Sequence, residues 1–499
     1  MIVKDLRITS REPIVFIHSS KTGIVDEESQ FVRIRSAKEQ IAAKAIVTED
    51  LVKPDEIGLP KYLLEKLRVK EGDQVNVQPR SRPLGYQAIR KKFKGKKWTK
   101  DDIQTILEQI YKHMLSDLEI ASFALAQQFQ RLDLDEIEYL AKGIAYYGEN
   151  LEFDEPVYDK HSIGGLPGNK VSLLIVPIVA AQGLLIPKTS SRAITSPSGT
   201  ADTMEVLAPV SFSAEEILEI APKSRGMIVW GGTMDLVPVD DIIIERAERP
   251  LSLDPQSLIV SSILSKKISM SVKNLVLDMP IGKGTKVEKR EDAFELANIF
   301  VEIGRRVGIR VDCALTYGNQ PLGHAIGPAL EAREALLTLT GKGPTSVREK
   351  SEELAGILFE MGNLSQKGQG ARLAEDVLSS GKALQKFREI IEAQGGNPNV
   401  KPDDLPIGQY TADVTAPRDG YIVEINNRDI KFLARVLGAP SSKGAGIYLN
   451  YKIGDFVKKG DVLATFYAES EGPLDEALKQ LNSHKFYTLE GMVLDRISR

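Results

Sequence analysis

A glycine-rich segment at residues 160–170, KHSIGGLPGNK, contains the residue types that bind phosphate. It stands directly before an apolar helical run, and glycines at a helix start let backbone N–H groups approach an anion. Lys160 and Ser162 add a positive charge and a hydroxyl donor. The segment lacks the spacing of a Walker A loop. Composition alone leaves a phosphate-binding loop and a simple connecting turn as equal alternatives.

A second segment, residues 189–202, is crowded with hydroxyl side chains and contains one arginine, Arg192. It reads TSSRAITSPSGTAD and directly follows an expected strand. Ligands of open α/β sheets gather at the carboxyl ends of strands, so this segment could bind a phosphate, a ribose or both. The alternative is a turn whose hydroxyls bond their own backbone. Two such segments after successive strands favour the binding interpretation.

A third group of residues could supply an acid and further donors. A carboxyl group near a departing base can act as a general acid if its pKa is raised. For Asp254 taken alone, an exposed helix N-cap is the favoured interpretation. His161 could act on a substrate or could be a hydrogen-bonded structural residue. The group comprises Asp254, Ser262, Lys266 and Lys286.

The first part of the chain predicts two modules. Short β-type runs fill residues 1–85 and predict a small β-rich module. Apolar residues then recur at helical spacing over residues 86–150, which predicts a helical lobe. Each of its three main helices is expected to start at a capping box, formed by Thr99 with Asp102, Ser116 with Glu119, and Asp133 with Glu136.

The remainder of the chain predicts an α/β lobe and a second β domain. Strand-like runs alternate with helical runs over residues 151–239 and 271–405, which predicts a mainly parallel sheet covered by helices. Residues 240–270 are helical again and are expected to return to the helical lobe. Residues 406–499 predict a small antiparallel sandwich-like domain. The predicted fold class is therefore α/β multidomain.

Composition excludes several classes of protein. A length of 499 residues predicts several domains, and the 42% hydrophobic and 27% charged content is typical of soluble proteins. A formal net charge of −4 gives no indication of a nucleic-acid partner, and the run KKFKGKK at residues 91–97 is interpreted as a solvated linker. No apolar run is long enough to span a membrane, and the first residues lack a signal-peptide pattern. We therefore predict a cytoplasmic protein without a membrane partner.

The chain contains a single cysteine, Cys313, in an apolar run. One cysteine forms no disulfide within the chain, and no Cys/His cluster offers a metal site. A lone cysteine in such a run is more often a packing residue than a nucleophile. The sequence therefore predicts no metal site.

Several longer motifs in order resemble the thymidine/pyrimidine-nucleoside phosphorylase family, and within it most closely its archaeal AMP-specific branch. The similarity extends over the full chain. It includes KHSIGGLPGNK, SSRAITSPSGTADTMEVL, WGGTMDLVPVDDII, SSILSKK, NQPLGHAIGPALEAREAL and GAGIYLNYKIGDFVKKGDVLA.

This resemblance implies a domain organisation and a reaction. The family has a helical lobe, an α/β lobe with the substrate in the cleft between them, and a C-terminal β domain. The N-terminal module resembles one that serves assembly, which implies a homodimer that assembles into larger homo-oligomers. The implied reaction converts AMP and phosphate to adenine and ribose 1,5-bisphosphate, with CMP and UMP as further substrates. No metal or organic cofactor is implied, because phosphate is itself the nucleophile.

The resemblance also implies roles for individual residues. Asp254 corresponds to the acid that protonates the departing base. The implied phosphate-binding residues are Lys160, Ser162, Ser172, Ser190 and Thr200. The implied AMP-binding residues are Gly165, Ser191, Arg192, Ala193, Ile194, Thr195, Ser196, Thr200, Ser262 and Lys286.

The hydroxyl-rich segment departs from the nucleoside-specific branch of the family. That branch carries SGRGLxxTGGTxDxxE, whereas this chain reads SSRAITSPSGTADTME. The added hydroxyls would suit the 5′-phosphate of a nucleotide. The nearest alternative is a phosphorylase of unphosphorylated thymidine or uridine.

Two more distant alternatives stay open. One is a phosphoribosyltransferase, which would need Mg²⁺ and acidic ligands. The other is a carrier protein, because GYIVEI and VKKGDVLATFYAES resemble halves of a biotinyl or lipoyl domain. The hairpin-tip lysine motif of such carriers is absent from the sequence.

Overall fold

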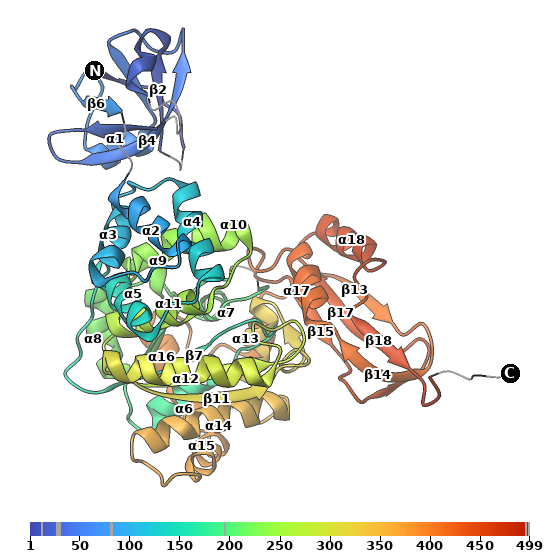
Figure 1. The fold of residues 1–499 in the computed structure, drawn as a ribbon. Coiled ribbons are helices and arrows are strands. Elements are labelled where there is room, and N and C mark those ends of the chain that lie inside the picture. The colour runs from blue at the N-terminus through green and yellow to red at the C-terminus, as the bar shows by residue number, and fades with distance from the viewer. Residues whose placement is uncertain (11–12, 26–30, 80–82, 194–195, 495–496, 498–499) are drawn as a thin grey trace. The chain divides into compact units, whose positions relative to one another are not determined.

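The structure, a computed structural model, divides into two compact units (Figure 1). Unit 1 comprises Met1–Tyr147 and Val237–Ser262, and unit 2 comprises Gly148–Leu236 and Ile263–Arg499. The structure describes residues 1–10, 13–25, 31–79, 83–193, 196–494 and 497.

Unit 1 begins with a six-stranded mixed sheet in the order β1-β5-β2-β4-β3-β6. In β3, FVRIR, Val32 and Ile34 are fully buried and their neighbours are not, as the alternation of a half-buried strand requires. The elements are β1 (Ile2–Asp5), β2 (Ile14–His18), η1 (Ser19–Ile24), β3 (Phe31–Arg35), β4 (Gln40–Thr48), β5 (Glu56–Leu59), α1 (Lys61–Leu67) and β6 (Asn76–Pro79). The predicted β-rich module is confirmed.

The rest of unit 1 is helical. All three expected capping boxes form at the starts of α3, α4 and α5, so side chains satisfy backbone N–H groups that the helices leave unpaired. The elements are α2 (Leu84–Phe93), α3 (Lys100–Tyr111), α4 (Asp117–Phe129), α5 (Leu134–Tyr146), α9 (Pro238–Ile243), the π-helical η3 (Ile244–Glu248), α10 (Arg249–Leu251) and the first half of α11 (Gln256–Ser269).

The prediction of a solvated linker at residues 91–97 is wrong in part. The run begins inside α2, and the Lys92 side chain is 5% exposed. Its Nζ lies 2.5 Å from a carboxylate oxygen of Glu136. A charged residue is buried only when a partner compensates its lost hydration, and that partner, 44 residues away, is invisible in the local pattern. Lys92 therefore packs α2 against α5.

Unit 2 contains the parallel strands of the α/β lobe. β7 (Val157–Ser162), β10 (Val272–Ile281) and β11 (Arg310–Tyr317) form one parallel sheet in the order β11-β10-β7. β8 (Ile186–Ser190) pairs in parallel with β9 (Gly226–Trp230), and a parallel bridge joins Val157 to Leu185. The predicted mainly parallel sheet is confirmed.

Helices cover these strands, with α12 packed on β11 and α14 on β10 (Figure 1). Every residue of α6 from Ser172 to Ala180 is buried, as a helix that is apolar all round requires. The elements are α6 (Ser172–Ala181), α7 (Thr200–Met204), α8 (Ala214–Ser224), η2 (Gly231–Met234), α12 (Arg290–Val307), α13 (Pro328–Leu339), α14 (Thr345–Met361), α15 (Gly370–Ser379), α16 (Lys382–Ala393) and η4 (Pro402–Asp404).

The C-terminal part of unit 2 has two antiparallel sheets, β12-β15-β17-β13 and β16-β14-β18. The sandwich-like domain is confirmed, but it also carries α17 and α18, which the turn-rich pattern did not predict. Its elements are β12 (Ala325–Ile326), β13 (Tyr410–Thr415), β14 (Gly420–Ile425), α17 (Asn427–Val436), β15 (Gly446–Leu449), β16 (Phe456–Val457), β17 (Val462–Ala468), α18 (Glu471–Gln480) and β18 (Tyr487–Glu490). In the described ranges, no helix is both long and apolar enough to cross a membrane.

Candidate phosphate-binding site

The glycine-rich segment follows β7 and leads into α6, as the sequence predicts. Lys160 and Ser162 are the fourth and last residues of β7. Gly164 and Gly165 have φ values of +93° and +90°, which a residue with a Cβ rarely adopts. The Ser162 hydroxyl accepts hydrogen bonds from the Gly164 N–H at 3.3 Å and the Asn169 amide at 3.1 Å. The strand end and the loop are therefore fixed to each other.

The Lys160 ammonium group is buried beside Asp278. Its Nζ lies 3.7 Å from Oδ2 of Asp278, and Lys350 Nζ lies 3.0 Å from the other carboxylate oxygen. Thr316 and Asn169 donate hydrogen bonds to the same carboxylate, at 2.6 and 2.9 Å. Burial raises the pKa of Asp278, but the two lysines and these donors outweigh it and hold that pKa well below its usual range. Burial lowers the pKa of Lys160 to about 8.

A second aspartate, Asp159, holds two further buried lysines. Lys267 Nζ lies 2.5 Å from one carboxylate oxygen and Lys188 Nζ lies 3.6 Å from the other. Burial lowers the pKa of Lys188 to about 7. Burial and the nearby lysines also hold the pKa of His161 well below its usual range, so this imidazole is neutral at pH 7.

Four buried lysines therefore surround two buried aspartates, one in β7 and one in β10. This excess of positive groups favours an anion, because a bound anion compensates the desolvation of the ammonium groups. Three uncharged polar atoms buried here have no hydrogen-bond partner among the described residues: His161 Nδ1, Asn169 Oδ1 and Thr189 Oγ1. The cluster comprises Lys160, Lys188, Lys267, Lys350, Asp159 and Asp278.

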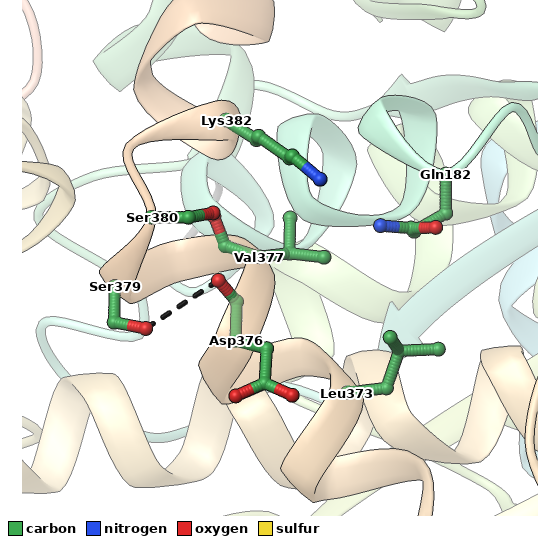
Figure 2. A pocket seen from close by; sticks show the side chains of 7 residues that line it. All are labelled: Gln182, Leu373, Asp376, Val377, Ser379, Ser380 and Lys382. Atoms are coloured by element: carbon green, nitrogen blue, oxygen red, sulfur yellow. Dashed lines mark hydrogen bonds between the residues drawn. The ribbon is translucent and has the colours of Figure 1, made fainter.

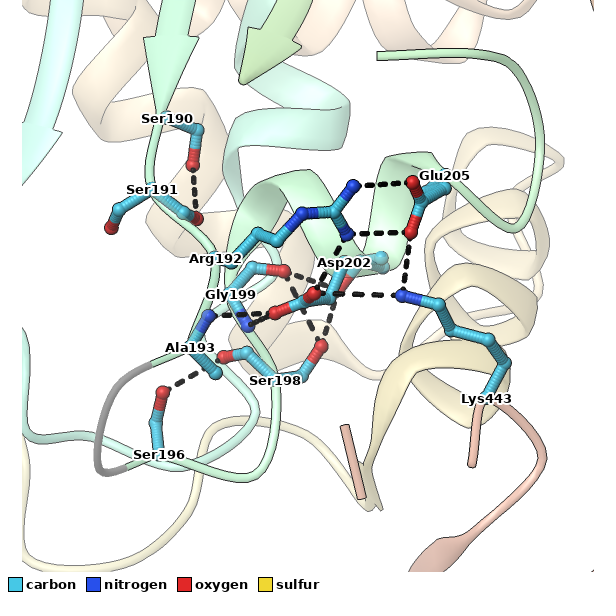
Figure 3. Close-up of polar contacts among 11 residues, drawn as sticks. Ser190, Ser191, Arg192, Ala193, Ser196, Ser198, Gly199, Asp202, Glu205 and Lys443 are labelled. Carbon is cyan, nitrogen blue, oxygen red and sulfur yellow. Dashed lines mark hydrogen bonds and ion pairs between the residues drawn. The ribbon is translucent and has the colours of Figure 1, made fainter. Parts of the chain in front are cut away.

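The arginine of the hydroxyl-rich segment is held by carboxylates (Figure 3). Arg192 donates to both carboxylate oxygens of Glu205, at 2.6 and 2.5 Å, and stacks on Trp230 at 4.6 Å. Lys443 Nζ lies 2.7 Å from Glu205. The hydrogen bond from Arg192 is the main cause that lowers the pKa of Glu205 to about 2. The guanidinium group thus fixes the loop, and its predicted contact with AMP stays a prediction.

The backbone of the same loop is tied together by Asp202. One carboxylate oxygen accepts from the N–H groups of Ala193 at 2.7 Å and Gly199 at 3.0 Å. The Ser190 and Ser196 hydroxyls donate to carbonyl groups of their own loop, at 3.2 and 3.1 Å. These hydrogen bonds to the loop's own backbone are those expected of a simple connecting turn. Each hydroxyl oxygen can still accept a further hydrogen bond.

Other predicted binding residues lie at the ends of elements. Ser172 is the first residue of α6 and is buried, and Thr200 is the first residue of α7. Ser191 lies in the loop of Figure 3. Ile194 and Thr195, both predicted to contact AMP, lie outside the described residues.

Gly165 touches the segment that carries Lys286. A Cβ built on Gly165 would lie 2.6 Å from the backbone nitrogen of Lys286 and 2.9 Å from Cα of Thr285. A Cβ on Gly164 would lie 3.9 Å from Cε of Lys286. The structure therefore brings together two predicted AMP-binding residues that are 121 positions apart in the sequence.

Replacement of Gly165 by alanine is expected to raise the KM for AMP about tenfold or more, because the added methyl group displaces the Lys286 segment. Gly183→Ala is the matched control, since Gly183 has φ +84° but nothing within 4 Å of an added Cβ. Both variants carry the backbone strain of about 1–2 kcal/mol, which thermal unfolding measures. Equal KM values for AMP in the two variants would contradict the account.

Asp254 and Ser262, two further predicted site residues, belong to unit 1. Asp254 is exposed, just before α11. The Ser262 hydroxyl donates to a carboxylate oxygen of Asp240 at 2.8 Å. Lys266 lies in the half of α11 that belongs to unit 2, next to the buried Lys267.

Sequence reasoning missed the buried charges behind Lys160. Asp278 lies inside the apolar run NLVLDMPIG, and Lys188 lies inside LLIPKTS. A charge inside an otherwise apolar strand was the available signal, because such a residue is buried only with a partner. Lys350 on α14 gives no such signal, since its helix also carries exposed charges.

Neither the thiol nor a metal cluster offers an alternative site in the described part of the chain. Burial raises the pKa of the Cys313 thiol to about 12, so this thiol is protonated at neutral pH and suits packing. No group of three or more His, Cys, Asp or Glu side chains among the described residues could hold a metal ion.

A surface hollow lies at the other end of α6 from the glycine-rich segment (Figure 2). It is lined by Gln182, which follows α6, and by residues of α15 and α16 such as Asp376 and Lys382. A ten-residue helix is about 15 Å long, so the hollow is remote from Lys160. It provides exposed positions for control substitutions.

Three segments of the chain match known protein families. Residues 86–148 match the helical bundle domain of a glycosyl transferase family, and residues 154–384 match the α/β domain of that family. Residues 421–487 match the pyrimidine nucleoside phosphorylase C-terminal domain, which accounts for the segment that resembled a carrier. These matches define the class of the protein: a glycosyl transferase with a nucleoside phosphorylase C-terminal domain.

Near full-length relatives narrow this class. The chain is 49% identical over 468 residues to the AMP phosphorylase of Thermococcus kodakarensis, covering 93% of each chain. It is 45% identical over 504 residues to AMP phosphorylase 1 of Archaeoglobus fulgidus, covering 100% of this chain and 99% of the relative. The chain belongs to the AMP phosphorylase family, as its motifs predict.

Among the solved structures with a similar fold is an enzyme that matches part of the chain. Anthranilate phosphoribosyltransferase from Thermus thermophilus matches with a TM-score of 0.53 and 18% identity, covering 62% of this chain and 99% of that chain. At this identity the likeness concerns the fold alone.

Proposed function

We propose that this protein catalyses the phosphorolysis of AMP to adenine and ribose 1,5-bisphosphate. The observation that carries the proposal is the buried lysine cluster around Lys160 of β7, which suits an inorganic phosphate. The hydroxyl-rich segment after β8 supplies hydroxyl groups that can rotate away from their own loop carbonyls and donate to a second phosphate, the one at C5′ of the nucleotide. The AMP phosphorylases that share near full-length similarity support the same substrate.

In the proposed mechanism, phosphate attacks C1′ of the ribose while the adenine leaves from the opposite face. The transition state has oxocarbenium character, as in other glycosyl transfers. The Lys160 ammonium group and the amides of the glycine-rich segment orient the phosphate and stabilise its charge. Asp278 holds Lys160 in place, and Asp254 protonates the departing base. Phosphate is the nucleophile, so the mechanism needs no metal or organic cofactor.

Several finer expectations belong to this proposal. CMP and UMP are expected to serve as further substrates. The protein is expected to act in the cytoplasm as a homodimer that assembles into larger homo-oligomers through the β-rich module. Light scattering of the full chain measures that assembly.

Chromatography of AMP with and without inorganic phosphate tests the proposal. Adenine release that requires phosphate, with thymidine and uridine inert, is the expected result. Cleavage of the nucleosides alone would overturn the nucleotide substrate. A requirement for added Mg²⁺ and pyrophosphate chemistry would favour the phosphoribosyltransferase alternative.

The KM for phosphate is expected to rise above pH 8, by about tenfold for each further pH unit. The pKa of Lys160 is lowered to about 8, so below this pH the free enzyme already carries the ammonium group. Above it the group is neutral, and phosphate binding requires uptake of a proton. The measurement is the KM for phosphate from pH 6.5 to 10, with the KM for AMP as internal control. A flat phosphate profile would contradict the charge assigned to Lys160.

A further inference from the structure

The start of α17, in the C-terminal domain, is bonded to the segment that carries Lys286. Asn427 is 1% exposed, and its side-chain amide donates to the carbonyl oxygens of Lys283 at 2.9 Å and Gly318 at 2.8 Å. A Cβ on Gly284 would lie 3.2 Å from Cβ of Asn427, so the two backbones approach closely. The C-terminal domain therefore contacts the segment that carries Lys286, a predicted AMP-binding residue.

Lys431, one helical turn further along α17, bridges two segments of that site. Its Nζ donates to the carbonyl oxygen of Gly165 at 3.3 Å and to that of Gly284 at 3.0 Å. One ammonium group thereby joins the glycine-rich segment to the Lys286 segment. Burial, followed by the charges of Arg428 and Lys286, lowers the pKa of Lys431.

Ion pairs fix the same junction from the outside. Arg428 lies 2.7 Å from a carboxylate oxygen of Glu288, and that oxygen accepts the N–H of Gly284 at 3.0 Å. Lys283 Nζ lies 2.5 Å from Glu424. These pairs are exposed and contribute little stability each, so the junction is held mainly by the buried Asn427 amide and the half-buried Lys431 bridge.

We propose that Lys431 is a positioning residue for the nucleotide: it holds Gly165 and Lys286 at the separation that AMP binding requires. This inference rests on the proposed function. Lys431 acts through the two carbonyl groups and is assigned no contact with the substrate. Without the bridge, each carbonyl can bond water instead, and the Lys286 segment can move away from Gly165.

The kinetic test compares Lys431→Met with Lys479→Met. Lys479 is an exposed lysine of α18 in the same domain, so the control makes the same chemical change without touching the site. Lys431→Met is expected to raise the KM for AMP about tenfold and to leave kcat and the KM for phosphate within about twofold of wild type. Kinetic constants equal to those of the control would overturn the proposal. So would a fall in kcat accompanied by equal rises in the KM for AMP and the KM for phosphate.

A double-mutant cycle separates positioning from a general loss of stability. If Lys431 acts through Lys286, Lys431→Met is expected to change the KM for AMP by less than about twofold in a Lys286→Met background. Additive effects of the two substitutions would overturn the proposal.

A third measurement does not depend on activity. Backbone amide exchange in residues 282–288 is expected to be faster in Lys431→Met than in Lys479→Met, because the segment has lost its bridge. Unchanged exchange would overturn the positioning role even in an active enzyme. Faster exchange in a protein that leaves AMP uncleaved would support the bridge and refute the proposed function instead.

Discussion

Replacement of Lys160 by methionine is expected to lower kcat/KM for phosphate by about 10²–10³-fold, the usual loss when one preorganised donor to a reacting anion is removed. The ammonium group is buried 3.7 Å from Asp278, so solvent water cannot take over its role when it is removed. Methionine has a similar length and no charge, so the change removes the cation with little loss of packing. Initial rates at varied phosphate and saturating AMP measure the effect.

Two controls make the Lys160 result specific. Lys382→Met alters an exposed lysine at the hollow of Figure 2 and is expected to leave kcat/KM for phosphate within about twofold of wild type. Asp278 keeps its contacts with Lys350 and Thr316 in Lys160→Met, so the variant is expected to fold, which thermal unfolding checks. A folded Lys160→Met enzyme with unchanged phosphate kinetics would contradict the phosphate site.

Replacement of Asp254 by asparagine is expected to lower kcat for AMP by about 10²–10³-fold, within the range that general acid catalysis supplies. Asparagine keeps the size of the side chain but has no proton to give to the departing adenine. An AMP analogue methylated at N7 has a base that leaves without protonation. Its cleavage rate is expected to be nearly the same in the variant and the wild type.

The control for Asp254 is Asp376→Asn, an exposed acid at the same hollow as Lys382. It makes the same chemical change and is expected to leave kcat for AMP within about twofold of wild type. Equal losses on AMP and on the methylated analogue would show that Asp254 has another role than proton donation.

Much of the fold could be predicted from local patterns. Capping boxes such as Thr99 with Asp102 act within four residues, so the sequence around each helix start contains the whole interaction. The strands that precede the two candidate loops alternate with helices, which is enough to predict a parallel sheet. The glycine-rich segment lies at the end of β7 for the same reason.

The features of the site that the sequence did not predict depend on contacts between residues far apart in the chain. The contact of Arg192 with AMP stays a prediction, and the sequence gives no sign of its ion pair with Glu205, which also pairs with Lys443 more than 200 residues away. Lys350 and Asp278 are 72 positions apart, and neither residue type identifies the other. Lys431 gives no local signal, because its two acceptors are backbone carbonyl groups. Such pairs become visible only when the chain has folded.

Attack by phosphate at C1′ is tested by running the reaction with AMP and ¹⁸O-labelled inorganic phosphate and analysing the sugar product by mass spectrometry. If phosphate is the nucleophile, the product is ribose 1,5-bisphosphate equimolar with adenine, with the label in the phosphate at C1 and in its bridging oxygen. Release of unlabelled ribose 5-phosphate, with the label left in free phosphate, would show hydrolysis by water and contradict phosphate as the nucleophile.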